Sequence, residues 1–213
     1  LRSIHNCGEF YDHSRRWVTH ASIQRTDLTQ VRRWREEYRK PVVVDECCYE
    51  GNIKFNWGNL TGEEMVNQFW TGMCNGGYVG HGETYVHPED LLWWSKGGVL
   101  HGKSPERIGF LKNLLEQDVR DGQMRCLNAD NKAFWNETCH VYDGDRYYLW
   151  YQMNRQSAER IVKLPEDKKY HIDLIDCWNM KVEPLKGEFS GENIIILPGK
   201  PMYCIRAVLI DEE

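Results

Sequence analysis

The sequence predicts a chain in two parts, an α/β part with parallel strands and an all-β part that follows it. Over residues 1–120, short apolar runs alternate with amphipathic helical runs, which is the pattern of βα units. One run, Val42–Glu46, opens with three consecutive valines, as strands buried on both faces of a parallel sheet do. Over residues 121–213, alternating β-rich runs between turn dipeptides predict an antiparallel β-sandwich of about 90 residues.

The α/β part is expected to contain four strands and three helices. The first helix begins near Asp27, a suitable N-cap, and the second follows the capping-box sequence Thr61-Gly62-Glu63-Glu64. The third begins at Ser104-Pro105, because proline is favoured in the first helical turn. The expected strands are Leu1–Asn6, Trp17–Gln24, Val42–Glu46 and Tyr78–Tyr85. The link between the first two strands is short for a parallel crossover, which usually takes about a dozen residues.

The all-β part is expected to contain eight short strands. Turn sequences such as Asp143-Gly144, Lys186-Gly187 and Pro198-Gly199 separate several of them. The expected strands are Phe134–Thr138, His140–Tyr142, Arg146–Met153, Glu159–Val162, Tyr170–Asp176, Met180–Pro184, Asn193–Leu197 and Met202–Ile210.

Charge and composition exclude several classes of protein. The formal net charge is -5, whereas a protein that binds nucleic acid carries a basic face. No apolar run has the length of a transmembrane helix, so no membrane partner is expected. The 9 Trp and 11 Tyr suit surfaces that stack on sugars, although burial in β-sheets is the commoner use of aromatic residues.

The eight cysteines predict neither a metal site nor a disulfide framework. None has C-x-x-C spacing, and the adjacent Cys47 and Cys48 suit neither a bridge between them nor a zinc site. Small buried cysteines in a reducing compartment favour a cytoplasmic location, with no metal and no cofactor, whereas an upstream signal peptide would indicate secretion. A redox role for Cys47 and Cys48 is a weaker hypothesis, because no basic or helix-terminal surroundings are evident to lower their thiol pKa values.

Polar side chains recur where the expected parallel strands end. They are His5 and Asn6, then His20, Ser22 and Gln24, then Asp45 and Glu46, and finally His81 and Glu83. Because the carboxyl ends of neighbouring parallel strands meet at one rim, we expect these side chains to converge. Alternation along Val42–Glu46 places Asp45 and Glu46 on opposite faces, and we expect Glu46 to point into the site.

Aromatic residues accompany these strand ends. The loops around the expected rim contain Tyr11, Tyr49, Trp57, Tyr85, Trp93 and Trp94. Hydrolysis of a glycosidic bond requires one carboxylate that attacks or stabilises an oxocarbenium-like centre and another that transfers a proton, and aromatic rings stack on sugars. The pattern therefore favours chemistry on carbohydrates.

Four stretches resemble a known group of enzymes. They are Ser3–Asn6, Thr19–Gln24, Pro41–Gly51 and Gly76–Tyr85. Together they resemble the second half of the (β/α)8 barrel of clan A glycoside hydrolases, the cellulase-like superfamily, and within it they are most similar to apiosidase-like glycosidases. In that group a C-terminal β-sandwich follows the barrel. Three further stretches resemble it, namely Leu91–Gly102, Asp176–Met180 and Leu197–Pro201.

The resemblance implies a retaining glycoside hydrolase of plant-type or other polysaccharides and oligosaccharides, with Glu46 as nucleophile. The acid/base glutamate of the group lies at the end of strand four, which would precede Leu1, so this chain alone would lack it. Residues 1–120 would supply strands five to eight of the barrel, and residues 121–213 an accessory sandwich. The other half of the barrel would come from elsewhere in a longer protein, from another chain or from a homo-oligomer.

Further site residues come from the polar and aromatic side chains at the same strand ends. A narrower variant makes Glu83 the second carboxylate, within about 5–5.5 Å of Glu46. The residues expected to orient Glu46 or bind the carbohydrate are His5, Asn6, His20, Gln24, Tyr49, His81, Tyr85, Trp93 and Trp94.

A second hypothesis is a non-catalytic carbohydrate-binding or scaffold protein that acts through its β-sandwich. Its aromatic residues are Trp135, Tyr147, Tyr148, Trp150, Tyr151 and Trp178. Alternation divides those of the run from Tyr147 to Tyr151 between two faces, so at least one set is expected to lie in the core.

Overall fold

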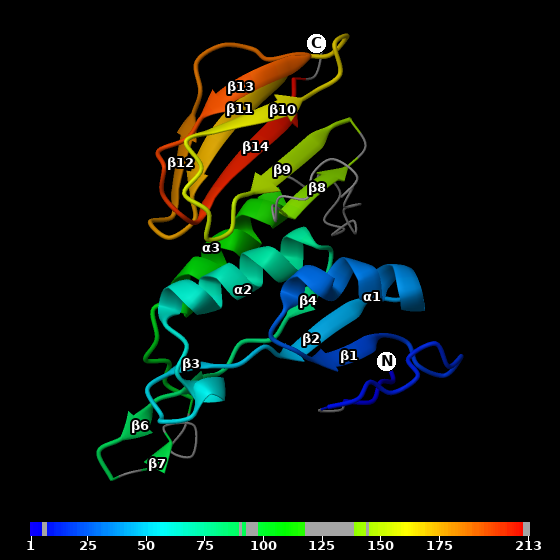
Figure 1. Cartoon of the computed structure of the whole chain (residues 1–213), viewed down its shortest axis with the longest axis vertical. Helices are drawn as coiled ribbons and strands as arrows, with labels where there is room; N and C mark the ends of the chain where they lie inside the picture. The colour runs from blue at the N-terminus through cyan, green and yellow to red at the C-terminus, as the bar shows by residue number, and fades with distance from the viewer. Residues whose placement is uncertain (6–7, 90, 93–97, 118–138, 144, 211–213) are drawn as a thin grey trace. The chain divides into compact units, whose positions relative to one another are not determined.

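The structure, a computed structural model, describes residues 1–5, 8–89, 91–92, 98–117, 139–143 and 145–210 (Figure 1). Contacts divide the chain into two compact units, Leu1–Gly109 and Phe110–Glu213. The boundary expected between residues 120 and 121 falls outside the described ranges. None of the helices in these ranges combines the length and the apolar character of a membrane span.

The first unit contains a three-stranded parallel sheet. Its strands are β1 (Ala21–Gln24), β2 (Val42–Glu46) and β4 (Tyr78–Val79), in the order β1-β2-β4. Val42 and Val44 are buried, whereas Val43 is only partly buried. The predicted parallel pairing is confirmed for these strands, and the strand of valines has the predicted bounds.

Two helices lie on the same face of this sheet (Figure 1). Helix α1 (Val31–Tyr38) follows a 3-10 turn, η1 (Leu28–Gln30), whose N-cap is Asp27, as predicted. Helix α2 (Gly62–Cys74) has the predicted capping box: the Thr61 hydroxyl accepts the Glu64 amide at 3.1 Å, and the Glu64 carboxylate accepts the Thr61 amide at 2.8 Å. Helix α3 (Ser104–Gln117) begins at the predicted residue.

Two predicted strands differ from the structure. The run Tyr78–Tyr85 is broken, because the chain leaves β4 at Gly80 and forms a separate strand, β5 (Glu83–Thr84), which pairs in parallel with β3 (Glu50–Gly51). The described part of Leu1–Asn6 is not a strand. Residues 1–5 instead run beside the approach to β1, where the Thr19 amide donates to the Arg2 carbonyl at 2.8 Å.

The described part of the first unit contains three further short elements. They are a 3-10 turn, η2 (Asn56–Gly58), and the antiparallel pair β6 (Val86–His87) and β7 (Leu91–Leu92).

The second unit contains two antiparallel sheets. The strands are β8 (Cys139–Asp143), β9 (Tyr147–Tyr151), β10 (Glu159–Lys163), β11 (Tyr170–Asp176), β12 (Lys181–Pro184), β13 (Glu192–Ile196) and β14 (Tyr203–Leu209). One sheet has the order β12-β11-β14-β9-β8, and the other pairs β10 with β13. Each of these strands matches a predicted run, whereas Phe134–Thr138 lies outside the described residues.

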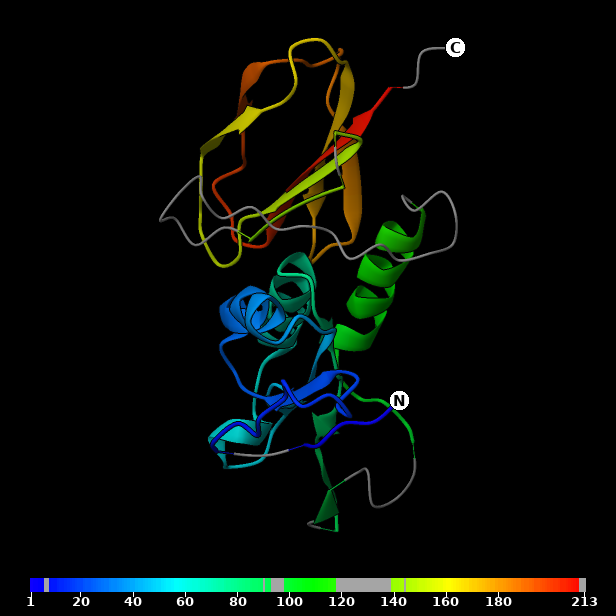
Figure 2. The same cartoon turned by 90° about the vertical axis from the view of Figure 1, so that its right-hand side faces the viewer.

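The two sheets of the second unit share one core, and Figure 2 shows them as separate layers. Trp150 from β9 packs there with Val162, Ile172, Ile195 and Ile205 from four other strands. The described strands of the second unit are thus antiparallel, as predicted, and form two sheets with a common core.

The burial of the aromatic residues in this unit argues against the hypothesis that they stack on glycans. Tyr147, Trp150 and Tyr151 are buried, and Tyr148 is only partly exposed and packs against the same core. These rings stabilise the unit and leave little surface for a sugar. Trp178 is partly exposed, and Trp135 lies outside the described residues.

His13 is a fully buried histidine in the first unit. Its ring lies among the rings of Phe10, Tyr11 and Tyr38, and neither ring nitrogen has a hydrogen-bond partner among the described residues. Burial lowers the pKa of His13, and the positive charge of Lys40, whose Nζ donates to the His13 carbonyl at 2.6 Å, lowers it further.

We predict that acid destabilises the first unit through His13. Because its folded-state pKa lies below the ordinary 6.5, the unfolded chain takes up the proton first, and stability is lost as the pH falls below about 6.5. Urea unfolding should show a loss of stability between about pH 7.5 and about pH 5.5 that His13→Phe removes. His20→Phe, at a partly exposed histidine, is the control and should retain the loss. Equal pH dependence in wild type and His13→Phe would contradict the prediction.

Candidate functional site

Polar side chains at the carboxyl ends of β1 and β2 gather around His5, and we call His5, Gln24, Asp45, Glu46 and Tyr49 the strand-end cluster. The β1–β2 register places Gln24 beside Glu46. His5 Nε2 lies 3.1 Å from Gln24 Oε1 and 3.9 Å from Glu46 Oε2. His5 Nδ1 lies 3.4 Å from Asp45 Oδ2, so the ring bridges two carboxylates that alternation separates along the strand.

The chain turns back directly after Glu46. Cys48 has a left-handed backbone with φ of +76°, and this turn brings the Tyr49 side chain to Glu46. Tyr49 Oη donates to Glu46 Oε1 at 2.5 Å, and the Tyr49 ring packs on Gly82, where a Cβ would come within 2.6 Å of two ring atoms. Burial raises the pKa of Tyr49, and the hydrogen bond to Glu46 raises it further, so the phenol remains a donor. Glu46 itself keeps 34% of its side chain exposed.

The turn after Glu46 also contains the adjacent cysteines. Cys47 is buried, and burial raises the pKa of its thiol to about 12. Burial also raises the pKa of Cys48, and the nearby Glu46 carboxylate adds to the effect. Both side chains are therefore neutral thiols at neutral pH, which argues against the redox hypothesis and for a packing role.

A second acidic group, the buried glutamate pair, consists of Glu50 and Glu83, which are neighbours in the β3–β5 register. Glu50 is 1% exposed, and the Glu83 side chain is 8% exposed. Their oxygens accept four consecutive backbone amides: those of residues 101 and 102 donate to Glu83 at 2.7 and 3.0 Å, and those of residues 103 and 104 to Glu50 at 2.7 and 3.0 Å. The pair thus satisfies the amides that lead into α3, where negative charge is favoured.

Glu50 accepts further hydrogen bonds. The hydroxyl of Ser104 donates to its Oε2, and Tyr85 Oη donates to its Oε1 at 3.0 Å. Burial alone would raise the pKa of Glu50, but the hydrogen bonds from Ser104, from the Lys103 amide and from Tyr85 outweigh it and hold the pKa below its ordinary value. A Cβ at Gly102 would collide with this carboxylate, so glycine lets the backbone pass over it.

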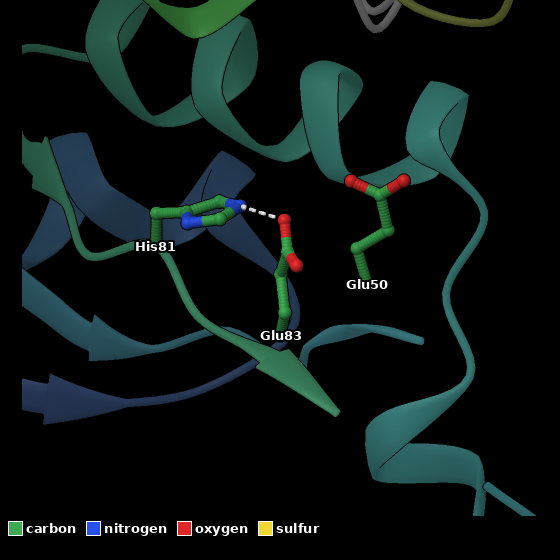
Figure 3. A group of neighbouring side chains, drawn as sticks. All are labelled: Glu50, His81 and Glu83. Carbon is green, nitrogen blue, oxygen red and sulfur yellow. Dashed lines mark ion pairs between the residues drawn. The ribbon is translucent and has the colours of Figure 1, made fainter. Parts of the chain in front are cut away.

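His81 lies beside this pair, and Figure 3 shows its ring facing Glu83. His81 Nε2 is 3.1 Å from Ser104 Oγ and 3.9 Å from Glu83 Oε1. One possible ligand atom from each of Glu50, His81 and Glu83 lies within 4.8 Å of the others, a spacing that could hold a metal ion. Four backbone N–H groups already donate to the two carboxylates, and their partial positive charges stabilise the carboxylates in place of a cation. We therefore interpret the group as a structural one.

The structure divides the predicted site residues. His5, Gln24, Glu46 and Tyr49 come together in the strand-end cluster. His20 does not join them, because it lies directly before β1, at the amino end of the strand. Asn6, Trp93 and Trp94 lie outside the described residues.

The other predicted site residues belong to the buried group. His81 contacts Ser104, Tyr85 contacts Glu50, and Glu83 lies 3.9 Å from His81, so all three surround the buried glutamate pair, with His81 and Tyr85 only partly buried. Both Glu83 oxygens hold backbone amides, which argues against Glu83 as the second catalytic carboxylate. The sequence analysis did not identify Glu50 as a functional side chain. Glu50 follows a turn, and no hydrophobic periodicity there predicts that a glutamate would be buried.

Comparisons with known proteins give the fold a context. A family described as "Domain of unknown function (DUF5605)" matches residues 135–208. A proposed glycoside hydrolase from Bacteroides vulgatus has a TM-score of 0.78 to this chain at 24% identity, over 95% of this chain and 43% of that one. A glycoside hydrolase family 5 protein of the same organism has a TM-score of 0.62 at 15% identity, over 93% and 52%. A search of curated proteins gave no match.

These solved structures share the mixed helix-and-sheet fold of this chain. At such identities the likeness shows the fold alone. A third structure, titled glycoside hydrolase, agrees with a TM-score of 0.61 at 14% identity, over 91% of this chain and 53% of that one. The chain spans about half the length of the structures that it matches.

We predict that Glu50→Gln destabilises the first unit by about 2–3 kcal/mol. Both oxygens of Glu50 accept hydrogen bonds from backbone N–H groups, and in glutamine one of those oxygens is replaced by an NH2 group, which is itself a donor. The pKa of Glu50 is lowered, so its contribution is present above about pH 4.5 and is lost as the pH falls through the folded-state pKa. Urea unfolding at neutral pH measures the loss, and the exposed Glu63→Gln should stay within about 0.5 kcal/mol of wild type. Equal stability of the two variants would refute the role given to Glu50.

We also predict that divalent cations leave the thermal midpoint unchanged, because the buried glutamate pair already faces amide donors. The measurement is the melting temperature in EDTA and in excess Ca²⁺ or Zn²⁺. A rise with either ion that Glu83→Gln removes would show instead that Glu50, His81 and Glu83 bind metal.

Proposed function

We propose that this chain is part of a retaining glycoside hydrolase and that Glu46 is its nucleophile. The observation that carries the proposal is the state of the Glu46 carboxylate. It is partly exposed at the carboxyl end of a parallel strand, and Tyr49 holds one of its oxygens at 2.5 Å. The glycoside hydrolase titles of structures with the same fold support this reading.

The geometry suits the first half of a double displacement. The Tyr49 hydrogen bond fixes Oε1, so Oε2 is the oxygen that would attack the anomeric carbon. The glycosidic bond breaks as the new carbon–oxygen bond forms, and the leaving oxygen takes a proton from a general acid. Water then displaces Glu46 from the glycosyl-enzyme, with the same acid group now acting as base.

His5 and Gln24 would position the nucleophile. His5 Nε2 contacts Gln24 Oε1 and approaches Glu46 Oε2, so the ring links β1 to the carboxylate on β2. On the other side of the ring, Asp45 accepts a hydrogen bond from the Ser22 hydroxyl and lies within reach of His5 Nδ1. Asp45 would therefore orient His5, much as a carboxylate orients a catalytic histidine in other enzymes.

The general acid is proposed to lie outside these 213 residues. A retaining mechanism needs a second carboxylate about 5–5.5 Å from Glu46, and Glu83 is committed to two backbone amides. In this proposal the parallel sheet is the later half of a (β/α)8 barrel, and the acid comes from a longer chain or from a partner copy. The half-length coverage of the similar structures supports it.

We predict that Glu46→Gln lowers kcat by at least about a thousandfold in the full-length protein and leaves its melting temperature unchanged, because the residue is partly exposed. The assay is hydrolysis of aryl glycosides with a reactive leaving group. Azide should restore turnover to Glu46→Ala and give a glycosyl azide of inverted configuration, because a small anion takes the place of the carboxylate. The exposed Glu37→Gln is the control, and full activity of Glu46→Gln would disprove the assignment.

A further inference from the structure

Two aromatic side chains near the strand-end cluster are stacked on each other and half exposed. The ring centroids of Phe55 and Trp57 lie 6.0 Å apart, and the ring planes differ by 6°. Phe55 is 51% exposed and Trp57 is 47% exposed. Single exposed aromatic residues are common, but two adjoining rings that share an apolar surface are typical of a binding site. We call Phe55 and Trp57 the aromatic pair.

Tyr49 connects the aromatic pair to the proposed nucleophile. Its ring meets Trp57 edge to face, with centroids 6.0 Å apart and an interplanar angle of 81°. Its hydroxyl donates to Glu46 Oε1. One side chain therefore contacts both the carboxylate and the aromatic pair, which places the pair next to Glu46.

Backbone hydrogen bonds fix the aromatic pair in place. The Tyr49 amide donates to the Trp57 carbonyl at 2.9 Å, and the Gly58 amide donates to the Phe55 carbonyl at 2.9 Å. The Thr84 hydroxyl donates to the Gly58 carbonyl at 2.7 Å from a buried position. A surface held in this way before the ligand arrives loses little conformational entropy on binding.

We propose that the aromatic pair is a second sugar subsite, on which a pyranose ring of an oligosaccharide stacks while the neighbouring sugar unit occupies the site at Glu46. A pyranose ring has an apolar C–H face that matches an aromatic surface, and its hydroxyl rim needs donors and acceptors. Lys54 provides a donor there, since its Nζ lies 5.2 Å from the Phe55 centroid. The substrate class is thus an oligosaccharide or polysaccharide longer than a single glycosyl unit.

This inference rests on the proposed role of Glu46, so the test separates binding from chemistry. The full-length Glu46→Gln protein is first applied to a microarray of plant and microbial oligosaccharides. Titration calorimetry then measures its affinity for the array oligosaccharide with the strongest signal. Adding Trp57→Ala or Phe55→Ala should weaken that affinity about five- to tenfold, whereas Trp57→Phe should change it less than about threefold.

A matched control is available in the same unit. Trp17 is 43% exposed and contacts Tyr11, but it makes no described contact with Tyr49 or Glu46. Trp17→Ala should leave the affinity unchanged. Melting temperatures identify any variant that fails to fold, and Phe55→Ala tests the subsite independently if Trp57→Ala does not fold.

Kinetics in the Glu46-containing protein provide the second readout. Trp57→Ala should raise KM for the oligosaccharide, whereas Trp17→Ala should leave it unchanged. The inference is overturned if Trp57→Ala and Phe55→Ala bind the oligosaccharide as tightly as their parent, or if the parent binds no oligosaccharide on the array. Activity that survives in Glu46→Gln would defeat the proposed function, whereas the binding comparison would still decide on the subsite.

Discussion

The first unit depends on two carboxylates that are buried beneath the amides leading into α3. Such burial is costly unless donors surround the charge, and here four consecutive amides face Glu50 and Glu83. Strands β3 and β5 are only two residues long, so their own ladder gives them little stability. The carboxylates connect both strands to a helix distant in sequence. Because Tyr49 directly precedes Glu50, the same hydrogen bonds hold the residue that donates to Glu46.

Local patterns in the sequence predicted much of this fold. Asp27, the Thr61 capping box and the valines of β2 act through their immediate neighbours, and each lies where the pattern placed it. The break between β4 and β5 was not predictable, because it depends on a tertiary contact at Gly80. The Asp45 carbonyl oxygen passes so close to Gly80 that a Cβ there would lie 2.7 Å from it. Convergence of Gln24 and Glu46 followed from the parallel topology, whereas His5 reaches them from a segment that is not a strand. Glu50 and Glu83 owe their roles to a segment far along the chain, which no local pattern reveals.

Aromatic content alone could not distinguish packing from binding. Of the six tryptophans in the described residues, Trp34, Trp70 and Trp150 are buried. In the second unit, Trp150 and Tyr170 belong to the shared core of the two sheets. Trp57 differs because a short 3-10 turn holds it outward beside Tyr49. The tertiary position of a ring, not its frequency in the sequence, therefore decides whether it can meet a ligand.

The hydrogen bond from Tyr49 to Glu46 has a consequence for the balance of the two half-reactions. In the proposed mechanism Oε2 becomes the ester oxygen of the glycosyl-enzyme, and Oε1 becomes its carbonyl oxygen. A hydroxyl binds a carboxylate more strongly than it binds a neutral ester, so Tyr49 would stabilise Glu46 more as a free anion than as an ester. In the proposed mechanism the bond would therefore make Glu46 a weaker nucleophile but a better leaving group. Tyr49 would slow formation of the covalent intermediate and hasten its breakdown, which keeps the enzyme from resting in the esterified state.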